Sequence, residues 1–349
     1  MYYYVMKSND IRRNLATEQY LMNEIKFDEP LLLFYIEGPC IIVGRNQNTL
    51  EEINKKYVDE HGIVVTRRLS GGGAVYQDLG NLCFSFVVDS DSEEFGDFKS
   101  FVQPIVDALH DMGAKSVEVS GRNDILVDGK KFNGLSAHVV KRKKFSGNAM
   151  YTKGGKTFSH GTLMLDVDLS VIPKALDVPE DKIKSKGIKS VSSRVTNLKP
   201  YLSPKYQDLT TPEFRDRLLK ELFHVDDLDQ IKDKEYHLTD DDQKGIDKIF
   251  DDYYNNWDWV YGNSPEFTVK KRQHFTNGTI DARLQVDDGK VSNVKFFGDY
   301  FGPQDSTEVA DKLKGVRFER KDFEDALKDV DLNQYFTGIS RDDFFDMLF

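Results

Sequence analysis

The expected fold of this chain depends most on one stretch, Arg67-Arg68-Leu69-Ser70-Gly71-Gly72-Gly73-Ala74-Val75. Apolar segments that are predicted to be strands flank it, residues 63–66 before and residues 82–88 after. Three consecutive glycines let the backbone adopt positive φ angles, so that successive N–H groups can converge on one anion. Arg68 adds a planar, permanently charged group that suits phosphate or carboxylate. We therefore predict an anion-binding loop between two strands, with a flexible surface loop as the alternative.

Two familiar phosphate-binding motifs do not fit the chain. The Gly-Lys-Thr sequence at Gly155 has Met150 where a Walker loop needs its first glycine, so it is expected to be a hairpin turn. The G-x-G-x-x-G spacing of dinucleotide-binding folds is missing from the glycine-rich stretch. The loop is therefore expected to be neither a P-loop nor a dinucleotide fingerprint.

Composition and charge narrow the function classes. With 349 residues the chain is long for one core, so two domains are expected. The formal net charge of -11 argues against nucleic-acid binding through the overall field. No apolar run approaches the about 20 residues that cross a bilayer, and the N-terminus lacks the order of a signal peptide. Cys40 and Cys83 lie in apolar runs and are expected to be buried, reduced thiols. We expect a cytoplasmic protein without membrane contact.

The order of predicted elements indicates the fold class. The predicted strands are residues 31–36, 40–44, 63–66, 82–88, 124–127 and 163–169, and the predicted helices begin at Asp10, near Phe98, at Thr211 and near Ile246. Because strands dominate the first half without alternating with helices, an α+β fold with a mixed sheet is favoured over a doubly wound parallel sheet. Near Pro265 a second unit begins with a hairpin around Asp288-Gly289, followed by short helices. We expect a catalytic domain over residues 1–250 and a small α/β domain over residues 265–349.

Four further motifs carry polar groups that suit a nucleotide or an acyl group. Gly121-Arg122-Asn123-Asp124 offers an amide and a carboxylate that could bind ribose or Mg²⁺, or could only satisfy their own turn. Lys144-Phe145-Ser146-Gly147-Asn148-Ala149 places a lysine beside small residues, where it could reach a carbonyl and a phosphate, or be a solvated turn. Ser159-His160-Gly161-Thr162 suggests close backbone approach to a ligand. Residues 185–197 fit a mobile loop that closes over a nucleotide, or a simple connector.

Together and in this order, these motifs resemble the lipoate–protein ligases of the biotin/lipoate ligase superfamily. The glycine-rich loop continues into Tyr76-Gln77-Asp78-Leu79-Gly80-Asn81 as in that family, and the later motifs follow at family-like positions. The resemblance covers residues 1–198 strongly, and residues 265–349 are similar to the family's small C-terminal domain with weaker motifs. It implies a mixed-sheet catalytic domain of the biotin/lipoate ligase type with a small α/β domain after it.

The resemblance implies a reaction in two steps. The lipoate carboxylate attacks the α-phosphate of ATP to give lipoyl-AMP and pyrophosphate, and a lysine of an acceptor domain then displaces AMP. Positioning and charge stabilisation would supply the catalysis, with no enzyme nucleophile. By resemblance, the acyl and phosphate groups are bound by Arg68, Ser70, Gly71, Gly72, Gly73 and Ala74, and the adenine lies near Val75, Tyr76 and Gln77. The nucleotide or metal site is lined by Asn81, Asn123, Asp124, Ala149, His160 and Thr162, Asp124 being the expected Mg²⁺ ligand, and Lys186 and Gly187 belong to the covering loop.

One departure from the family leaves two candidates for the catalytic lysine. Counted from the Gly-Arg-Asn-Asp motif, Lys131 fits, whereas counted back from His160-Gly161, Lys144 fits. About a dozen extra residues therefore lie between them by this comparison. We favour Lys144 because Ser-Gly-Asn-Ala follows it as the family motif requires. Lys131 is followed by the looser match Asn-Gly-Leu-Ser-Ala.

Three alternative functions are compared with the ligase, and the resemblance also implies acceptor proteins as partners. An octanoyl or lipoyl amidotransferase on the same fold would need a cysteine, and none follows Cys83. A biotin ligase would have a different pocket motif, and a non-catalytic lipoyl-domain binding paralogue stays open because of the insert. The expected acceptors are lipoyl domains of 2-oxoacid dehydrogenase E2 subunits or the glycine-cleavage H protein. A basic rim at residues 141–144 or 184–189 would offset the repulsion between two acidic proteins. We expect a monomer.

Overall fold

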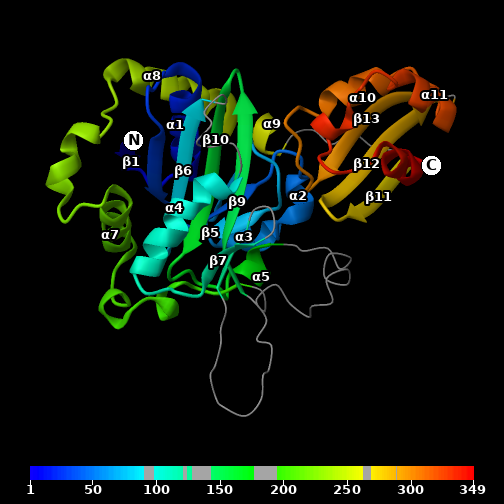
Figure 1. The fold of residues 1–349 in the computed structure, drawn as a ribbon. Helices are drawn as coiled ribbons and strands as arrows, with labels where there is room; N and C mark the ends of the chain where they lie inside the picture. The colour runs from blue at the N-terminus through cyan, green and yellow to red at the C-terminus, as the bar shows by residue number, and fades with distance from the viewer. Residues whose placement is uncertain (90–97, 121–123, 128–142, 177–194, 262–268, 288) are drawn as a thin grey trace, which may run out of the picture. The chain divides into compact units, whose positions relative to one another are not determined.

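The structure is a computed structural model that describes residues 1–89, 98–120, 124–127, 143–176, 195–261, 269–287 and 289–349 (Figure 1). The chain divides into two compact units. The first unit comprises residues 1–42, 53–66 and 75–256, and the second comprises residues 43–52, 67–74 and 257–349. Two short segments from the first quarter of the chain, one of which contains the glycines, therefore belong to the same unit as the C-terminal region.

A mixed sheet forms the centre of the first unit. Among the described residues its strands follow the order β1-β2-β6-β10-β9-β8-β7. Their bounds are β1 Tyr2–Val5, β2 Leu31–Ile36, β6 Asn81–Asp89, β7 Val117–Ser120, β8 Asp124–Val127, β9 Lys143–Lys153 and β10 Lys156–Met164. β1 pairs with β2 in parallel, and the other pairs are antiparallel. The predicted α+β class with a mixed sheet is confirmed.

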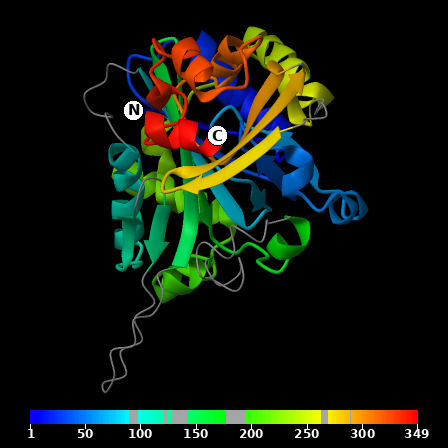
Figure 2. The same ribbon diagram turned by 90° about the vertical axis from the view of Figure 1, so that its right-hand side faces the viewer.

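Both faces of this sheet are covered, which explains why β2 is apolar at every position. Leu32 and Phe34 share a core with α4 (Phe98–Asp111) and α7 (Thr211–Phe223). α1 (Ile11–Glu24) packs against β6 and β10, and α8 (Asp240–Ile249) lies along α1 (Figures 1 and 2). The predicted helix start at Asp10 is confirmed, because its side chain accepts from Arg12 N at 2.9 Å and caps α1.

A second, smaller sheet brings the chain into and out of the glycine-rich loop. It has the order β4-β3-β5, with bounds β4 Val64–Arg67, β3 Cys40–Val43 and β5 Val75–Gln77. β3 and β5 are antiparallel, with Ile41 opposite Tyr76. The loop thus leaves one edge strand and returns as the other. This confirms the predicted strand before the loop and adds a short strand directly after it.

In the C-terminal region, a three-stranded sheet is followed along the chain by short helices (Figure 1). Strands β11 Val269–Phe275, β12 Gly278–Asp287 and β13 Lys290–Gly298 form an antiparallel meander. Helices α10 Thr307–Leu313, α11 Arg320–Ala326 and α12 Arg341–Leu348 share one apolar core with β12 and β13. The predicted hairpin and the three short helices are confirmed, whereas β11 was not predicted because its sequence, VKKRQHF, is mostly polar.

The remaining elements are short. Two predicted elements, the helix near Ile246 and the strand at 163–169, differ from the observed ones. They are α2 Thr49–Glu52, α3 Lys55–Glu60, α5 Ile172–Ala175, α9 Trp257–Val260, the π-turn η6 Phe250–Tyr254 and the 3-10 turns Lys199–Tyr201, Pro204–Tyr206, Leu228–Lys234 and Leu332–Gln334. The amphipathic helix predicted near Ile246 is divided between α8 and η6. The strand predicted at 163–169 is the end of β10, which stops at Met164. Across the described ranges, no helix has the length and apolar character to span a bilayer.

Candidate active site

Arg68 organises the glycine-rich loop from within. Its side chain is 7% exposed, and its Nη2 donates to the carbonyl oxygens of Gly71 at 2.7 Å and Gly73 at 2.9 Å. Its Nε donates to the Ser70 hydroxyl at 3.1 Å. Gly72 between them has a φ of +91°, which favours glycine. Arg68 was predicted to face the ligand, and in this structure its guanidinium turns the carbonyls of the loop inward.

Within the described part of the chain, the backbone N–H groups of the same loop have no acceptors. Among the residues that the structure describes, none accepts a hydrogen bond from the backbone N–H of Gly71, Gly72, Gly73 or Ala74. A Cβ at Gly73 would meet no described atom within 4 Å. The packing of the chain therefore gives no reason for glycine at position 73. Successive unsatisfied N–H groups beside open space are the geometry of an anion nest.

Arg67, by contrast, is a structural residue. Its Nε donates to the Trp259 carbonyl at 2.8 Å, and its Nη1 donates to the carbonyls of Gly44, Arg45 and Gln47 at 3.0, 2.9 and 2.7 Å. Its Nη2 donates to the Thr49 hydroxyl at 2.7 Å and the Val260 carbonyl at 2.9 Å. Burial lowers the pKa of Arg67 to about 10. The first of the two arginines therefore ties together the segments of the second unit.

The chain after the loop enters the first unit as β5 and makes a tight turn into β6. Val75 is half-buried, whereas Tyr76 and Gln77 are buried, and burial, with a smaller contribution from Asp78, raises the pKa of Tyr76. Gln77 Oε1 accepts from Asn81 Nδ2 at 3.0 Å and from Cys83 Sγ at 2.8 Å. Within the described ranges, the buried Asn81 Oδ1 has no hydrogen-bond partner. Gln77 was predicted to lie near the adenine and Asn81 to line the nucleotide or metal site, and the turn brings their amides together.

The tight turn between β5 and β6 depends on Asp78 and Gly80. Asp78 Oδ1 accepts from Gly80 N at 2.8 Å, and its Oδ2 accepts from Asp168 N at 3.0 Å. A Cβ at Gly80 would lie 2.1 Å from the carbonyl oxygen of Asp166. Only glycine fits at position 80, so the packing of the chain itself explains why this residue is glycine.

Lys144, Thr162 and Asp124 surround one residue of β9, Gly147. A Cβ at Gly147 would lie 3.3 Å from Lys144 Nζ, so the lysine side chain lies over this glycine. Thr162 Oγ1 accepts from Gly147 N at 3.1 Å, and the backbone of Asp124 lies opposite Gly147 across the β8–β9 ladder. The structure thus gathers, around one glycine, residues that the sequence placed in three separate motifs.

The end of the predicted covering loop also reaches Lys144. Thr196 N donates to the Lys144 carbonyl at 2.9 Å, and Val195 forms an isolated bridge to Lys144. Asn197 is bonded on both sides to the Val167 backbone, through Oδ1 at 3.1 Å and Nδ2 at 2.9 Å. Residues 195–197 therefore fasten the chain beside β9 directly after segment 177–194.

His160 belongs to a buried polar cluster that the sequence did not indicate. Its side chain is 10% exposed and its Nδ1 lies 3.1 Å from Glu18 Oε2. Glu18, 2% exposed, also accepts from the Tyr35 hydroxyl at 3.5 Å. One signal could have revealed Glu18: it occupies the apolar stripe of α1, three residues after Leu15 and four before Met22. An acidic residue at such a position is buried and needs a partner.

The glycine beside His160 has a different role from the predicted one. A Cβ at Gly161 would lie 1.8 Å from Asn148 Oδ1 and 2.5 Å from Phe84 Cζ. The side chains of neighbouring strands therefore fill the space that we expected a ligand to occupy. Ala149, which faces His160 across the β9–β10 ladder, is also buried. The glycine of this motif serves the packing of the sheet.

Both cysteines are buried and unlinked, as predicted. Each is 1% exposed, and burial raises the pKa of the Cys40 and Cys83 thiols well above the usual value. Thiols with raised pKa values stay protonated, and the thiolate is the form that attacks. Neither cysteine can therefore serve as an acyl carrier in this conformation.

Several predicted residues lie outside what the structure describes. They are Lys131, Asn123, Lys186, Gly187 and the side chain of Asp124, together with residues 141–142 and 184–189 of the predicted basic rim. In the described part of the chain, no three His, Cys, Asp or Glu side chains gather as a metal site would.

Comparisons with known proteins identify the family. The model of the Lipoyl protein ligase A/B catalytic domain matches residues 10–223, and that of the Bacterial lipoate protein ligase C-terminus matches residues 264–348. Lipoate-protein ligase LplJ of Bacillus subtilis is 46% identical over 341 residues, which are 98% of this chain and 97% of the relative. The chain belongs to the lipoate–protein ligase family.

Solved structures of lipoate–protein ligases have the same fold. LipL1 of P. falciparum, solved in complex with lipoate, matches with a TM-score of 0.69 and 25% identity over 99% of this chain and 97% of that one. The bipartite lipoate protein ligase of Thermoplasma acidophilum, described with its E2 lipoyl domain, matches with a TM-score of 0.61 and 26% identity over 77% of this chain and 98% of that one. The ligase fold deduced from the motifs is therefore confirmed.

Proposed function

We propose that this lipoate–protein ligase activates lipoate with ATP and transfers the lipoyl group to a lysine of an acceptor protein. The observation that carries the proposal is the glycine-rich loop, whose four successive N–H groups lack acceptors among the described residues while Arg68 holds its carbonyls. Such a loop stabilises negative charge without reorganising during the reaction. Membership of the family supports the choice of lipoate and ATP.

In the first step, a lipoate carboxylate oxygen bonds to the α-phosphorus of ATP, and the bond from that phosphorus to the bridging oxygen breaks to release pyrophosphate. The N–H groups of Gly71–Ala74 bind the developing charge, with Arg68 and Ser70 fixing the loop. Val75, Tyr76 and Gln77 lie towards the adenine, and Asn81, Ala149, His160 and Thr162 line the remaining site. Positioning and charge stabilisation of this kind lower the activation free energy of this step.

In the second step, the amine of the acceptor lysine attacks the acyl carbon, and AMP leaves with the electrons of the acyl–phosphate bond. We propose that Lys144 polarises the acyl carbonyl and neutralises the α-phosphate in both steps. Its place over Gly147, whose N–H donates to Thr162 Oγ1, supports this choice. The attachment of residues 195–196 to Lys144 supports it further, because Lys186 and Gly187 precede them in the proposed covering loop.

Mg²⁺ is proposed to be held by Asp124 with Asn123, together with the phosphates of ATP. Mg²⁺ is usually bound through one or two carboxylates plus substrate phosphates, so a larger cluster of acidic side chains is not required. The backbone of Asp124 lies opposite Gly147, which supports its place near the phosphate-binding lysine. When bound, Mg²⁺ would neutralise phosphate oxygens of the nucleotide.

The proposed acceptors are a lipoyl domain of a 2-oxoacid dehydrogenase E2 subunit or a glycine-cleavage H protein, and the ligase is proposed to act as a cytoplasmic monomer. Residues 1–250 would carry activation and transfer, with residues 265–349 as an accessory domain. An archaeal ligase of the same fold is described with its E2 lipoyl domain, which supports the first acceptor class. Lys143 and Lys144 on β9 are half-buried members of the proposed basic rim.

The test combines the purified ligase, lipoate, ATP and an apo-lipoyl domain. We expect pyrophosphate and lipoyl-AMP without the acceptor, and AMP with a lipoylated acceptor when it is added. Omission of ATP should abolish both steps, and biotin should not compete with lipoate. Acyl transfer from a thioester donor in the absence of ATP would instead favour an amidotransferase, which the buried, protonated cysteines oppose. Binding of the lipoyl domain without any chemistry would favour a non-catalytic paralogue.

A further inference from the structure

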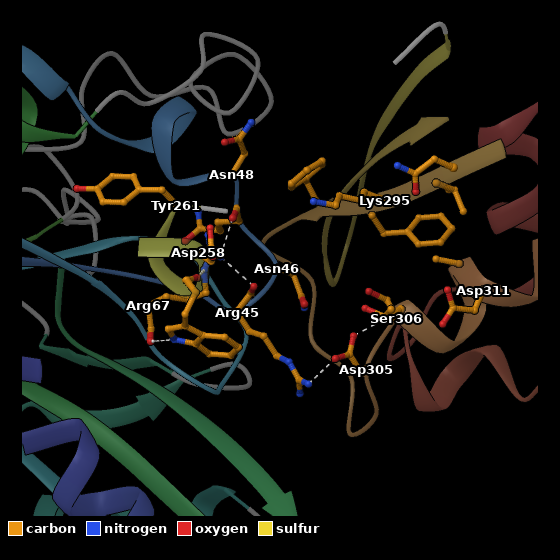
Figure 3. Close-up of a pocket in the computed structure, with 18 of the residues that line it drawn as sticks. Arg45, Asn46, Asn48, Arg67, Asp258, Tyr261, Lys295, Asp305, Ser306 and Asp311 are labelled. Atoms are coloured by element: carbon orange, nitrogen blue, oxygen red, sulfur yellow. Dashed lines mark hydrogen bonds and ion pairs between the residues drawn. The ribbon is translucent and has the colours of Figure 1, made fainter. Parts of the chain in front are cut away.

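A pocket of about 330 Å³ in the second unit is lined by charges of both signs (Figure 3). Arg45 Nη2 donates to Asp305 Oδ2 at 2.6 Å, and Asp258 and Lys295 line the same space. A lining that holds cations and anions together does not select a ligand by the sign of its charge. The pocket therefore indicates no class of ligand, whereas a buried cluster of polar side chains in the first unit does.

This cluster consists of Gln77, Asn81 and Cys83, whose side chains form a closed triangle of hydrogen bonds. Asn81 Nδ2 donates to Gln77 Oε1 at 3.0 Å and to Cys83 Sγ at 3.3 Å. Cys83 Sγ in turn donates to Gln77 Oε1 at 2.8 Å. All three residues are buried, so bulk water does not compete for these hydrogen bonds. Each side chain of the triangle therefore fixes the orientation of the other two.

The pairing of the strands places this triangle beside the proposed catalytic lysine. Asn81 and Cys83 are two residues apart on β6, so their side chains point to the same face of the sheet. Thr162 lies opposite Cys83 across the β6–β10 ladder, and opposite residues share one face. Thr162 Oγ1 accepts from the N–H of Gly147, over which the Lys144 side chain lies. The triangle thus adjoins the residues gathered around Gly147.

The thiol of Cys83 does more than fill space. A buried cysteine commonly serves as a small apolar side chain. Cys40 fits that description, since it is equally buried and its thiol makes no side-chain hydrogen bond in the described ranges. Cys83, by contrast, both donates and accepts. Burial raises the pKa of the Cys83 thiol, so the thiol keeps the proton that it donates to Gln77.

The Asn81 amide retains one acceptor that the fold does not use. Its Nδ2 is engaged twice, whereas its Oδ1 is buried and has no hydrogen-bond partner among the described residues. A buried acceptor without a partner costs free energy, which a ligand with a suitable donor recovers.

The chemistry of the substrates indicates which donor this oxygen meets. Ionised lipoate has no hydrogen-bond donor, and the phosphates of ATP are ionised as well. The donors that remain are the two ribose hydroxyls and the adenine amino group, all of which belong to the nucleoside. The unused oxygen of Asn81 therefore matches the nucleoside of ATP, and matches neither the acyl chain nor the phosphates.

We propose that Cys83 is a positioning residue, which holds the amides of Gln77 and Asn81 so that Asn81 Oδ1 accepts a hydrogen bond from the nucleoside of ATP. The inference rests on the proposed ligase function, because it takes ATP as the substrate. Cys83 carries no acyl group and gives up no proton during the reaction. Its effect on ATP is exerted through the two amides.

The first experiment compares Cys83→Ala with Cys83→Ser. Alanine and serine leave nearly the same space, so the pair differs in hydrogen bonding and little in packing. Cys40→Ala is the matched control for the loss of a buried thiol. Initial rates of pyrophosphate release give kcat and the KM values for ATP and lipoate, and calorimetry gives Tm on the same samples.

We expect Cys83→Ala to raise the KM for ATP roughly 2- to 12-fold, as the loss of one neutral hydrogen bond would. The KM for lipoate should stay near that of the parent, because the acyl chain offers no donor to Asn81. Cys83→Ser should retain most of the parent's KM for ATP, and Cys40→Ala should match the parent in both KM values. If serine raised the KM for ATP as much as alanine, packing would explain the effect and the inference would be overturned.

The second experiment identifies the donor with nucleotide analogues. 2′-DeoxyATP, 3′-deoxyATP and the purine ribonucleoside triphosphate that lacks the 6-amino group each remove one donor. Their KM values are measured with the parent, Cys83→Ala and Asn81→Ala. For the analogue whose missing group bonds to Asn81, both substitutions should raise KM much less than they do for ATP, because contacting groups are not additive.

Two other results would contradict the inference in distinguishable ways. Equal increases in KM for ATP and all three analogues, together with a greater requirement for Mg²⁺, would assign Asn81 Oδ1 to the metal and overturn the contact with the nucleoside. A parent protein that releases no pyrophosphate from ATP and lipoate would refute the proposed function itself, and the inference with it.

Discussion

Replacing Gly73 by alanine would test whether the ligand of the ligase lies against the glycine-rich loop. The added methyl group would meet no described atom within 4 Å, and Gly73 is not among the glycines with positive φ. The free energy of unfolding should therefore change little, or rise by about 0.4–1 kcal/mol, because alanine restricts the unfolded chain. In the complex, the same methyl group would occupy the space of a carboxylate or phosphate oxygen.

Displacing that oxygen from the N–H groups would lose at least one charge-assisted hydrogen bond, worth about 1.5–3 kcal/mol. At about 1.4 kcal/mol for each tenfold change, kcat/KM for pyrophosphate release should fall roughly 10- to 150-fold. The assay measures pyrophosphate release with lipoate and ATP, and calorimetry measures Tm on the same samples.

Two further variants make the result decisive. Gly38→Ala is the matched control, since its Cβ would make only an ordinary contact at 3.5 Å and the residue lies outside the loop. Gly72→Ala should instead lower Tm, because its φ is +91° and its Cβ would lie 3.0 Å from Arg68 Nη2. If Gly73→Ala kept both Tm and kcat/KM, the ligand would not lie against this glycine and the reasoning from open space would be refuted.

Other predictions concern the lysine and two buried ionisable residues, Glu37 and Arg67. Lys144→Ala should lower adenylate formation by orders of magnitude while Lys131→Ala has little effect, and the reverse pattern in a lipoyl-AMP assay would transfer the role to Lys131. Burial raises the pKa of Glu37 well above 4.5, so the unfolded chain loses this proton first and stability falls as pH rises above about 4.5. Glu37→Gln should remove that part of the decline. Thermal unfolding of both proteins from pH 4 to 8 measures this effect. If the carboxyl were ionised in the folded protein, the plots of Tm against pH for the two proteins would be parallel instead. Arg67→Lys keeps the charge but not the planar set of donors, and should lower the free energy of unfolding by about 2 kcal/mol or more in urea titrations. A change within about 0.5 kcal/mol would show that the carbonyls find other donors.

Local sequence determined much of the fold, and it also predicted the chemistry of the loop. The apolar run 31–36 predicted a strand buried on both faces, and the structure buries all six residues of β2. Asp10, and Thr211 with Pro212, predicted the starts of α1 and α7 because caps act within one turn of the helix. Consecutive glycines likewise predicted a nest, since the freedom of a glycine backbone does not depend on distant residues.

Contacts between distant segments decided what the sequence left open. The two adjacent arginines look equivalent in the sequence, yet Arg67 binds carbonyls from residue 44 to residue 260, and Arg68 shapes the loop that follows it. β11 has a polar sequence and becomes a strand only because β12 pairs with it. Burial of Glu18 against His160 joins residues 142 positions apart, which no local pattern encodes.

The sequence by itself thus predicted an anion-binding loop within residues 67–81, because glycine flexibility and arginine charge are properties of the residues themselves. The tertiary structure alone decided which arginine faces the loop and which glycines serve packing. It also showed that the Lys144 side chain lies over Gly147. These outcomes depend on which atoms the fold brings within hydrogen-bond or van der Waals distance, and that is settled only when separate strands come together in the sheet.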